Sequence, residues 1–327
     1  MTTVTHDDVS GRAPAETSRA AAGLLFALVS AASFGLSGSL AKGLIDAGWS
    51  PGSAVTVRIL GAVVVLAVPA LLALRGRWGV LRRNLGFVTG YGLAAVATAQ
   101  LCFFNAVAHM PVGVALLIEY TAPVAVVGWM WFRHGHTPGR LTVVGGVVAV
   151  AGLVLLLDLG PGTTVTLTGV LWSLGAMVGA AVYFVLSADE AGGLPPMVLA
   201  AGGLLVGGTL IWVAGLAGLV PLAASTAAVS LAGTSLPWWV PVAGLAMVTA
   251  ALAYTTGIAA GRRLGARLAS FVALTEVLMA VLFAWLLLGQ LPLPVQLAGG
   301  VLVLAGVVVV KAGERAVLDD DATVTTS

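Results

Sequence analysis

The carboxylates of Glu119 and Glu276 lie within long apolar stretches of the sequence, such as VALLIEYTAPVAVV at residues 114–127. A carboxylate that faces lipid is penalised by about 2.5 to 3.5 kcal/mol or more, so both should face a bundle interior or a water-filled cavity. Removal from water favours the protonated form of a carboxylate, which suits a group that carries a proton or binds a cation. A structural hydrogen bond or ion pair between helices is the alternative for each.

Arg58 is a third charged residue inside an apolar stretch. It could anchor a carboxylate of a substrate, reach to the membrane surface, or pair with Glu119. Other polar side chains in the apolar stretches could form hydrogen bonds with a ligand, although bonds between helices are the competing interpretation for each. These are Gln100, Asn105, Tyr120, Tyr183 and Tyr254, and Lys42 could guard an outer mouth or anchor a helix at the membrane surface.

The composition places these residues in a membrane. The 327 residues are 59% hydrophobic and only 9% charged, whereas soluble proteins carry roughly 25% charged residues. A helix needs about 20 apolar residues to cross the hydrocarbon, which predicts an all-α polytopic membrane protein of ten transmembrane helices. The predicted spans are 21–41, 52–72, 86–108, 112–132, 141–157, 169–188, 197–217, 238–260, 268–288 and 295–311.

The basic residues predict the orientation of these spans. With the N-terminus inside, all but two of the 15 Lys and Arg residues fall on the inner side, the exceptions being Lys42 outside and Arg58 within a span. Cytoplasmic loops are enriched in Lys and Arg. We therefore expect a multi-pass protein of the cell membrane with both termini in the cytoplasm.

The chain repeats itself. GGVVAVAGLVL at 145–155 resembles GGVLVLAGVVV at 299–309, an offset of 154 (299 − 145), which also superposes Trp131 on Trp285. A duplicated unit of five spans must cross the membrane in opposite senses, and inverted repeats with a site at the midplane are typical of secondary transporters. Glu119 and Glu276 should lie roughly 10 and 13 Å from opposite surfaces, both toward the midplane.

The glycines of this repeat have a structural explanation. Gly145 and Gly152 are seven residues apart, as are Gly299 and Gly306, so each pair lies on one helix face and permits close packing. A homodimer interface is the alternative.

Three stretches resemble the EamA-like family of the drug/metabolite transporter (DMT) superfamily. SFGLSGSLAK at 33–42 is similar to its first helix, SAVTVRILGAVVVL at 53–66 to its second, and TEVLMAVLFAWLLLGQLPLPVQLAGGVLVLAGVVV at 275–309 to the end of its repeat unit. The resemblance implies a ten-helix carrier, usually an exporter of small metabolites. It divides the chain into a cytoplasmic tail (1–20), a first repeat (21–157), a loop (158–168), a second repeat (169–311) and a second cytoplasmic tail (312–327).

The sequence departs from the family pattern in places. The expected Gly-Glu pair reads Gly135-His136 and Gly289-Gln290, and Val277 stands where a Pro is expected after Glu276. Glu119 occupies a position where the family carries no expected carboxylate, so its role could distinguish this protein from its relatives.

Other classes of function are poorly supported. GLSG at 35–38 matches the nucleophile motif of rhomboid-type intramembrane proteases, but no histidine base lies in a predicted span. The histidines, the single Cys102 and the absence of a phosphate loop predict no metal, no cofactor and no ATP use, and nothing indicates binding to nucleic acid. A membrane subunit without transport remains an alternative.

The sequence therefore predicts a protein that is not an enzyme. The expected function is proton-coupled export of a small metabolite, such as an amino acid, an amine or an amphiphilic drug-like compound, by alternating access. Its expected partners are the substrate, protons and the lipid bilayer. Proton-independent facilitation or exchange is the alternative.

Overall fold

A computed structural model describes residues 12–107, 109–110, 112–135, 138–157 and 165–324, which are almost entirely helical. The elements in chain order are α2 (Arg12–Asp46), α3 (Pro51–Ala73), α4 (Trp78–Arg83), α5 (Leu85–Gly90), η1 (Tyr91–Thr98), α6 (Ala99–Val107), α7 (Val112–Glu119), α8 (Ala122–His134), α9 (Arg140–Leu157), α10 (Leu167–Ala188), η2 (Ala191–Gly193), α11 (Pro196–Leu216), β1 (Val229–Leu231), β2 (Thr234–Leu236), α12 (Trp239–Ala246), η3 (Met247–Leu252), α13 (Ala253–Ala273), α14 (Thr275–Leu288) and α15 (Pro294–Val324).

The helices account for ten membrane crossings. Within the described chain, nine helices are long and apolar enough to span a membrane, and the shorter apolar helix Thr275–Leu288 follows the longest of them, Trp239–Ala273. Gly265 divides that longest helix, because its backbone has a φ of 77° and a ψ of 162°, a conformation that is readily open to glycine alone. The eighth span therefore ends before Gly265, and the ninth begins after it and continues through α14. This confirms the predicted all-α membrane fold of ten helices in two inverted repeats.

The turn at Gly265 is tighter than the sequence suggested. The predicted spans left residues 261–267 as a connecting loop, whereas helical backbone continues on both sides of the glycine. A single residue with positive φ reverses the chain here, so the neighbouring arginines lie on helix ends.

The two repeats share their irregularities as well as their sequence. η1 and η3 are both π-helices, and shifting Tyr91–Thr98 by 154 positions gives 245–252, which contains η3. The fourth span is interrupted at residues 120 and 121, and the ninth is interrupted at Leu274, the counterpart of Tyr120. π-helices and helix breaks occur frequently at functional sites.

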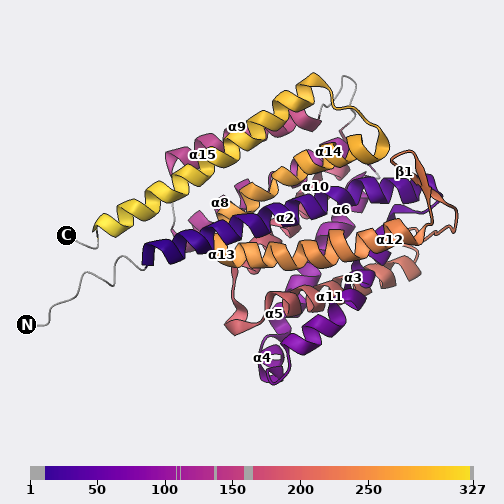
Figure 1. Cartoon of the computed structure of the whole chain (residues 1–327), viewed down its shortest axis with the longest axis horizontal. Coiled ribbons are helices and arrows are strands. Elements are labelled where there is room, and N and C mark those ends of the chain that lie inside the picture. The colour runs from indigo at the N-terminus through magenta and orange to yellow at the C-terminus, as the bar shows by residue number, and fades with distance from the viewer. Residues whose placement is uncertain (1–11, 108, 111, 136–137, 158–164, 325–327) are drawn as a thin grey trace, which may run out of the picture.

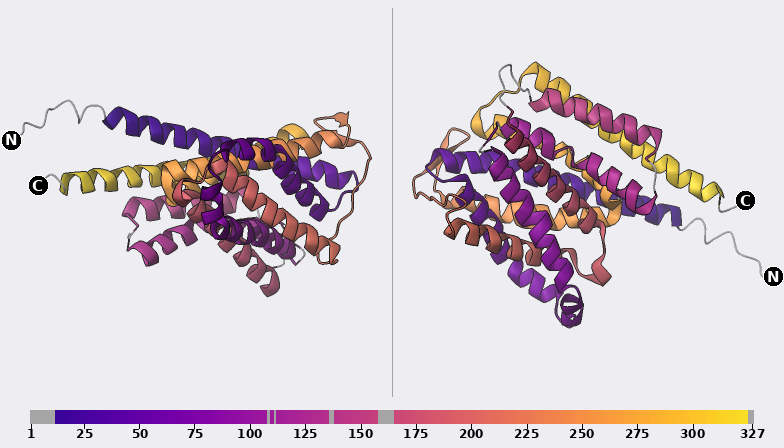
Figure 2. Two further views of the ribbon diagram at one scale, coloured as in Figure 1. Left: turned by 90° about the horizontal axis from the view of Figure 1, so that it is seen from below. Right: turned by 180° about the vertical axis from the view of Figure 1, so that it is seen from behind.

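α9 and α15 lie side by side along one edge of the bundle (Figures 1 and 2). Glycines allow this close approach, because a Cβ on Gly145 would lie 2.7 Å from the carbonyl oxygen of Gly306, and one on Gly152 would lie 2.7 Å from that of Gly299. The packing role predicted for these glycines is confirmed. The same faces are therefore already occupied within the chain.

The start of α2 and the end of α15 lie at one end of the molecule, and the β1–β2 hairpin lies at the other (Figures 1 and 2). An even number of spans requires this common end for the two termini. At the hairpin end, the amide of Ala232 donates a hydrogen bond to the carbonyl of Leu287 at 2.7 Å, and the indole of Trp49 donates to the carbonyl of Ser225 at 2.7 Å. The α11–α12 loop thus covers the ends of α2 and α14.

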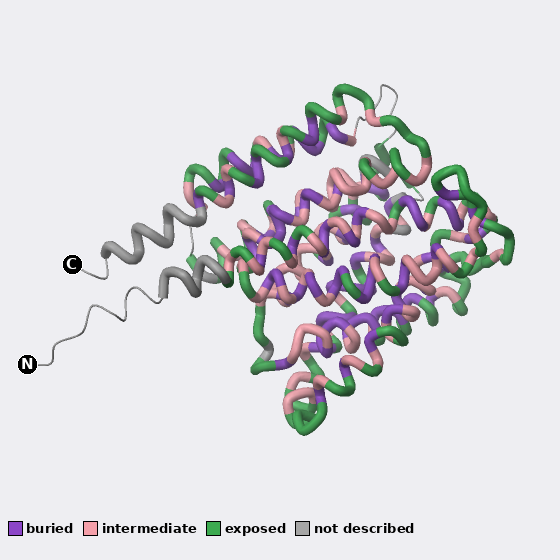
Figure 3. Tube along the Cα trace, viewed as in Figure 1, coloured by how far each residue is buried: buried purple, intermediate pink, exposed green. Residues whose placement is uncertain are grey.

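Burial follows the expectation for a membrane bundle. Figure 3 shows buried residues along the interior of the bundle and exposed residues along its periphery. Large apolar side chains such as Val64, Phe132 and Val301 are exposed, Phe132 by 88%. A periphery of this kind suits contact with lipid rather than water.

Candidate functional site

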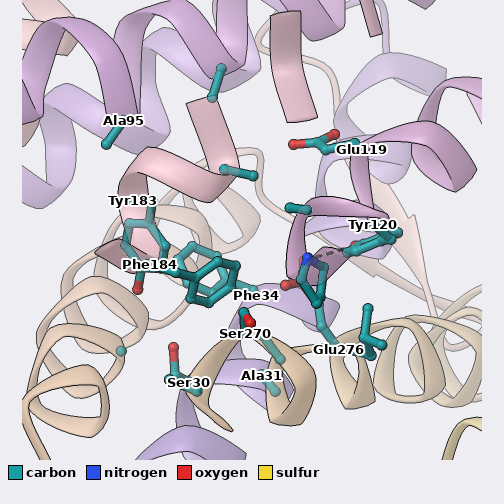
Figure 4. Close-up of a pocket in the computed structure, with 18 of the residues that line it drawn as sticks. Ser30, Ala31, Phe34, Ala95, Glu119, Tyr120, Tyr183, Phe184, Ser270 and Glu276 are labelled. Carbon is teal, nitrogen blue, oxygen red and sulfur yellow. Dashed lines mark hydrogen bonds between the residues drawn. The ribbon is translucent and has the colours of Figure 1, made fainter. Parts of the chain in front are cut away.

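A cavity of about 230 Å³, called here the central cavity, lies between helices of both repeats. Its wall combines α2, α3, η1, α6, α7 and α8 from the first repeat with α10, α13 and α14 from the second. Figure 4 shows aromatic rings on one side of this space and carboxylates on the other. The labelled side chains include Phe34, Tyr183 and Phe184 on the aromatic side, and Glu119, Tyr120 and Glu276 on the carboxylate side.

Equivalent positions of the two repeats line the central cavity together. The offset of 154 relates seven pairs of lining residues, which places the cavity between the inverted halves. Within these pairs, the residue equivalent to each glutamate is an alanine. Equivalent positions of the two repeats therefore line the same cavity with different chemistry. The pairs are Ser30 and Phe184, Gln100 and Tyr254, Phe103 and Gly257, Leu116 and Ser270, Glu119 and Ala273, Tyr120 and Leu274, and Ala122 and Glu276.

The two carboxylates lie beside the helix interruptions. Glu119 is the last residue of α7, and Glu276 is the second residue of α14. Pro123 contributes to the first interruption because it lacks the amide that a continuous helix would pair with the carbonyl of residue 119. At the equivalent position Val277 keeps its amide, yet the ninth span is still interrupted at Leu274. Broken helices at the midplane commonly present charged or polar groups to a transport site.

Glu276 is held by a residue of the other repeat. The hydroxyl of Tyr120 donates a hydrogen bond to Oε1 of Glu276 at 3.1 Å. Close helix contact fixes the backbone here as well, because a Cβ on Gly35 would lie 2.7 Å from the carbonyl oxygen of Glu276. This close packing of α2 on α14 explains the first glycine of the GLSG stretch.

Glu119 has a different environment. It is half-buried in the wall of the central cavity, and within the described chain its carboxylate forms no hydrogen bond or ion pair. It is also the terminal residue of its helix, where the negative end of the helix dipole disfavours a negative charge. Glu276 occupies the first turn of α14, where the dipole favours one. The two carboxylates are therefore not interchangeable.

Arg58 reaches the cavity wall from α3. Its Nη2 donates a hydrogen bond to the carbonyl of Thr249 at 2.9 Å, and its guanidinium lies 5.4 Å from the ring centroid of Phe34. Thr249 belongs to the π-helix η3, which departs from regular α-helical pairing. Among the described residues, no ion pair joins Arg58 to Glu119 or Glu276, although all three line the same cavity.

Aromatic rings form the opposite wall. The ring of Tyr254 meets Phe34 edge-on at 5.1 Å and Tyr183 edge-on at 5.7 Å, and Tyr183 meets Phe184 at 5.1 Å. Edge-to-face pairs fix the rings in place. Their exposed faces could hold an apolar or cationic group within a space that also contains carboxylates.

Seven of the nine residues singled out from the sequence line the central cavity. They are Arg58, Gln100, Glu119, Tyr120, Tyr183, Tyr254 and Glu276. Asn105 is elsewhere, and its amide donates to the carbonyl of Leu101 within α6 at 2.8 Å. Lys42 pairs with Asp46 at the hairpin end and lines a separate pocket there with residues 286–290.

The sequence interpretation missed Phe34 and Phe184 as cavity residues. Phe34 had a signal, because it is the aromatic residue of the SFGLSGSLAK stretch at 33–42. Phe184 had none of its own, since a phenylalanine in an apolar span is as well explained by packing or by lipid. Phe184 is equivalent to Ser30 of the other repeat, and both residues line the central cavity.

Comparison with known proteins agrees with this architecture. The EamA-like transporter family matches residues 21–158 and 167–312, which is one match for each repeat. The chain belongs to the EamA-like transporter family. A protein of known crystal structure is similar in fold to this EamA-like protein, with a TM-score of 0.71 and 20% identity, over 92% of this chain and 99% of the other. No curated protein matches the sequence.

Membership of the EamA-like family makes this chain a membrane transporter of the drug/metabolite type. The central cavity then lies where a transporter of inverted repeats would bind its substrate.

Proposed function

We propose that this EamA-like protein is a proton-coupled secondary transporter that exports a small metabolite through the central cavity. The observation that carries the proposal is the position of Glu119 and Glu276, which enter one cavity from opposite repeats beside equivalent helix interruptions. Carboxylates inside a membrane are costly, and they mark proton relays and ion pathways in pumps and transporters.

The inverted repeats supply a route for alternating access. Each half presents the same backbone to the cavity from the opposite side of the membrane, so an exchange of conformations between the halves closes one entrance and opens the other. With the predicted orientation, both termini and the arginine-rich ends of the helices face the cytoplasm. Substrate would then enter from the cytoplasm and leave at the end covered by the β1–β2 hairpin.

The test is the pH inside proteoliposomes that contain the purified protein. Pools of amino acids, amines and small aromatic cations are added outside in turn, beside the variants Glu119→Gln and Glu190→Gln. Glu190 is an exposed carboxylate outside the cavity and serves as the matched control. We expect one pool to move protons in the wild type and the Glu190 variant, and none to do so in the Glu119 variant.

Two other outcomes would contradict the proposal. Tracer exchange without any movement of protons would favour the proton-independent exchanger. Proton movement that survives in Glu119→Gln, with the folded state verified by gel filtration, would remove the role assigned to Glu119.

A further inference from the structure

The charges around the central cavity determine how many protons and substrates it can hold. Groups able to titrate or carry charge face it from six places in the fold, and histidine, lysine and aspartate are absent from its described wall. These groups are Arg58 on α3, Glu119 on α7, Tyr120 between α7 and α8, Tyr183 on α10, Tyr254 on α13 and Glu276 on α14.

One carboxylate is already matched with a positive charge. An arginine keeps its charge in any protein environment, and Arg58 lines the same cavity as both carboxylates. Glu276 also accepts the hydrogen bond from Tyr120 and lies at the positive end of α14. Arg58 and an ionised Glu276 together give a cavity with no net charge.

Glu119 then carries the remaining, uncompensated charge. It forms no hydrogen bond or ion pair in the described chain, and it lies at the negative end of α7. A net charge inside the membrane is strongly disfavoured. The cavity can keep Glu119 neutral with a proton, or it can leave Glu119 ionised and bind one positive charge from a substrate.

We propose that the central cavity takes a singly charged organic cation with an aromatic or apolar face, and that this cation and one proton occupy Glu119 alternately. When the cation binds, Glu119 releases its proton to the same side of the membrane, and when the cation leaves on the other side, a proton returns. One cation is exchanged for one proton, and no net charge crosses the membrane. This inference rests on the proposed transport function and specifies its substrate class and stoichiometry.

The shape of the cavity agrees with such a substrate. The volume of about 230 Å³ suits a compact molecule, close to one aromatic ring with a short amine arm. The rings of Phe34, Tyr183 and Phe184 lie across from the carboxylates (Figure 4), and Tyr254 packs edge-on against Tyr183. Together these rings can contact the apolar face and the cationic group of a substrate.

A carboxylate on the substrate would bring a further negative charge into the cavity. Arg58 is the single basic residue in the described wall, and an ionised Glu276 already compensates its charge. An amine should therefore bind in preference to the corresponding amino acid.

The first experiment needs no substrate. Infrared spectra of the ligand-free protein at neutral pH should contain the C=O stretch of a protonated, buried carboxyl group. This band should vanish in Glu119→Gln, where Arg58 still compensates an ionised Glu276, and it should persist in Glu190→Gln. A band that persists in Glu119→Gln, or a wild-type protein without the band, overturns the assignment. If Glu119→Gln does not fold, Glu119→Asp should shift the band, and an unshifted band overturns the assignment equally.

The second experiment uses 2-phenylethylammonium as the probe, with phenylalanine as its zwitterionic counterpart and 2-phenylethanol as its neutral one. Titrations in two buffers of different ionisation enthalpy report the protons released on binding. We expect about one proton for each bound cation, binding at least about tenfold weaker in Glu119→Gln, and weaker binding of the other two probes. Cation binding without proton release, tighter binding of phenylalanine, or no binding of the cation overturns the proposal.

These tests are separable from the test of transport. The infrared band and the released proton are equilibrium properties of the cavity, so they can fail while proteoliposomes still show proton-coupled flux of another substrate. Conversely, a protein that releases a proton on binding the cation but moves nothing across a membrane would overturn the proposed transport function and retain the site.

Discussion

The hydroxyl of Tyr120 donates a hydrogen bond to Oε1 of Glu276 at 3.1 Å and so joins the first repeat to the second beside the central cavity. Tyr120 begins the interruption of the fourth span, and its counterpart, Leu274, interrupts the ninth. The bond therefore connects the two places where the inverted helices are broken.

Replacing Tyr120 with phenylalanine should alter transport without unfolding the protein. The donor that favours the ionised form of Glu276 is lost, so Glu276 protonates more readily and the pH profile of transport should move toward higher pH. A hydrogen bond to a charged group contributes about 1.5 to 3 kcal/mol. The control is Tyr91→Phe, which removes a buried hydroxyl 3.5 Å from Oγ of Ser187, outside the cavity wall. Equal profiles for both variants would contradict the role of Tyr120.

Exchanging the charges of Arg58 and Glu119 should not restore transport. The double variant Arg58→Glu with Glu119→Arg would rescue function if the two side chains formed a specific pair, but the described residues contain no such ion pair. Arg58 is held by the carbonyl of Thr249 and the ring of Phe34, and a glutamate can use neither contact in the same way. Flux of the double variant well above that of both single variants would show that the pair does form during transport.

Replacing Gly152 with alanine should destabilise the contact between α9 and α15. The added Cβ would lie 2.6 Å from the backbone nitrogen of Val303, and overpacking of this kind costs about 1 to 3 kcal/mol. Gly128→Ala on α8 is the matched control, because nothing lies within 4 Å of the Cβ it adds. Thermal unfolding in detergent should show a lower Tm for Gly152→Ala only, and equal Tm values would argue against close backbone packing here.

The predicted orientation can be tested with an impermeant thiol reagent on intact cells. Cys102 is the single cysteine of the chain and is buried, so Cys102→Ala gives a background without thiols. A cysteine at Thr226, which is exposed in the loop before β1, should react from outside, and one at Arg77, which is exposed between α3 and α4, should react only after the cells are opened. The opposite pattern would invert the protein in the membrane.

The sequence was sufficient for the fold because the membrane restricts the choices. Apolar length predicted the helices, and the offset between Gly145 and Gly299 predicted the inverted halves, which the positions of η1 and η3 now display in the backbone. Gly265 was harder to interpret, because a single glycine with positive φ can replace a loop of several residues.

The candidate site was predicted only in part. Charged residues in apolar spans have a clear signal, and Arg58, Glu119 and Glu276 all line the cavity. The sequence could not show how the surroundings of these residues differ, because the hydrogen bond from Tyr120 to Glu276 joins residues that are 156 positions apart. Asn105 looks as polar as Gln100 in the sequence, but its amide bonds to the carbonyl of Leu101 within its own helix.

The most direct test of the central claim is accumulation driven by a pH gradient alone. Proteoliposomes held at zero membrane potential are given a pH gradient, and the uptake of labelled 2-phenylethylammonium, or of the pool found to move protons, is followed in the wild type and in Glu119→Gln. We predict that initial uptake toward the more acidic side is faster in the wild type than in protein-free liposomes, which report passive diffusion of the neutral amine, and that uptake in Glu119→Gln is no faster than in those liposomes. Equal initial rates in both proteins, or wild-type flux that ignores the gradient, would contradict proton coupling through Glu119.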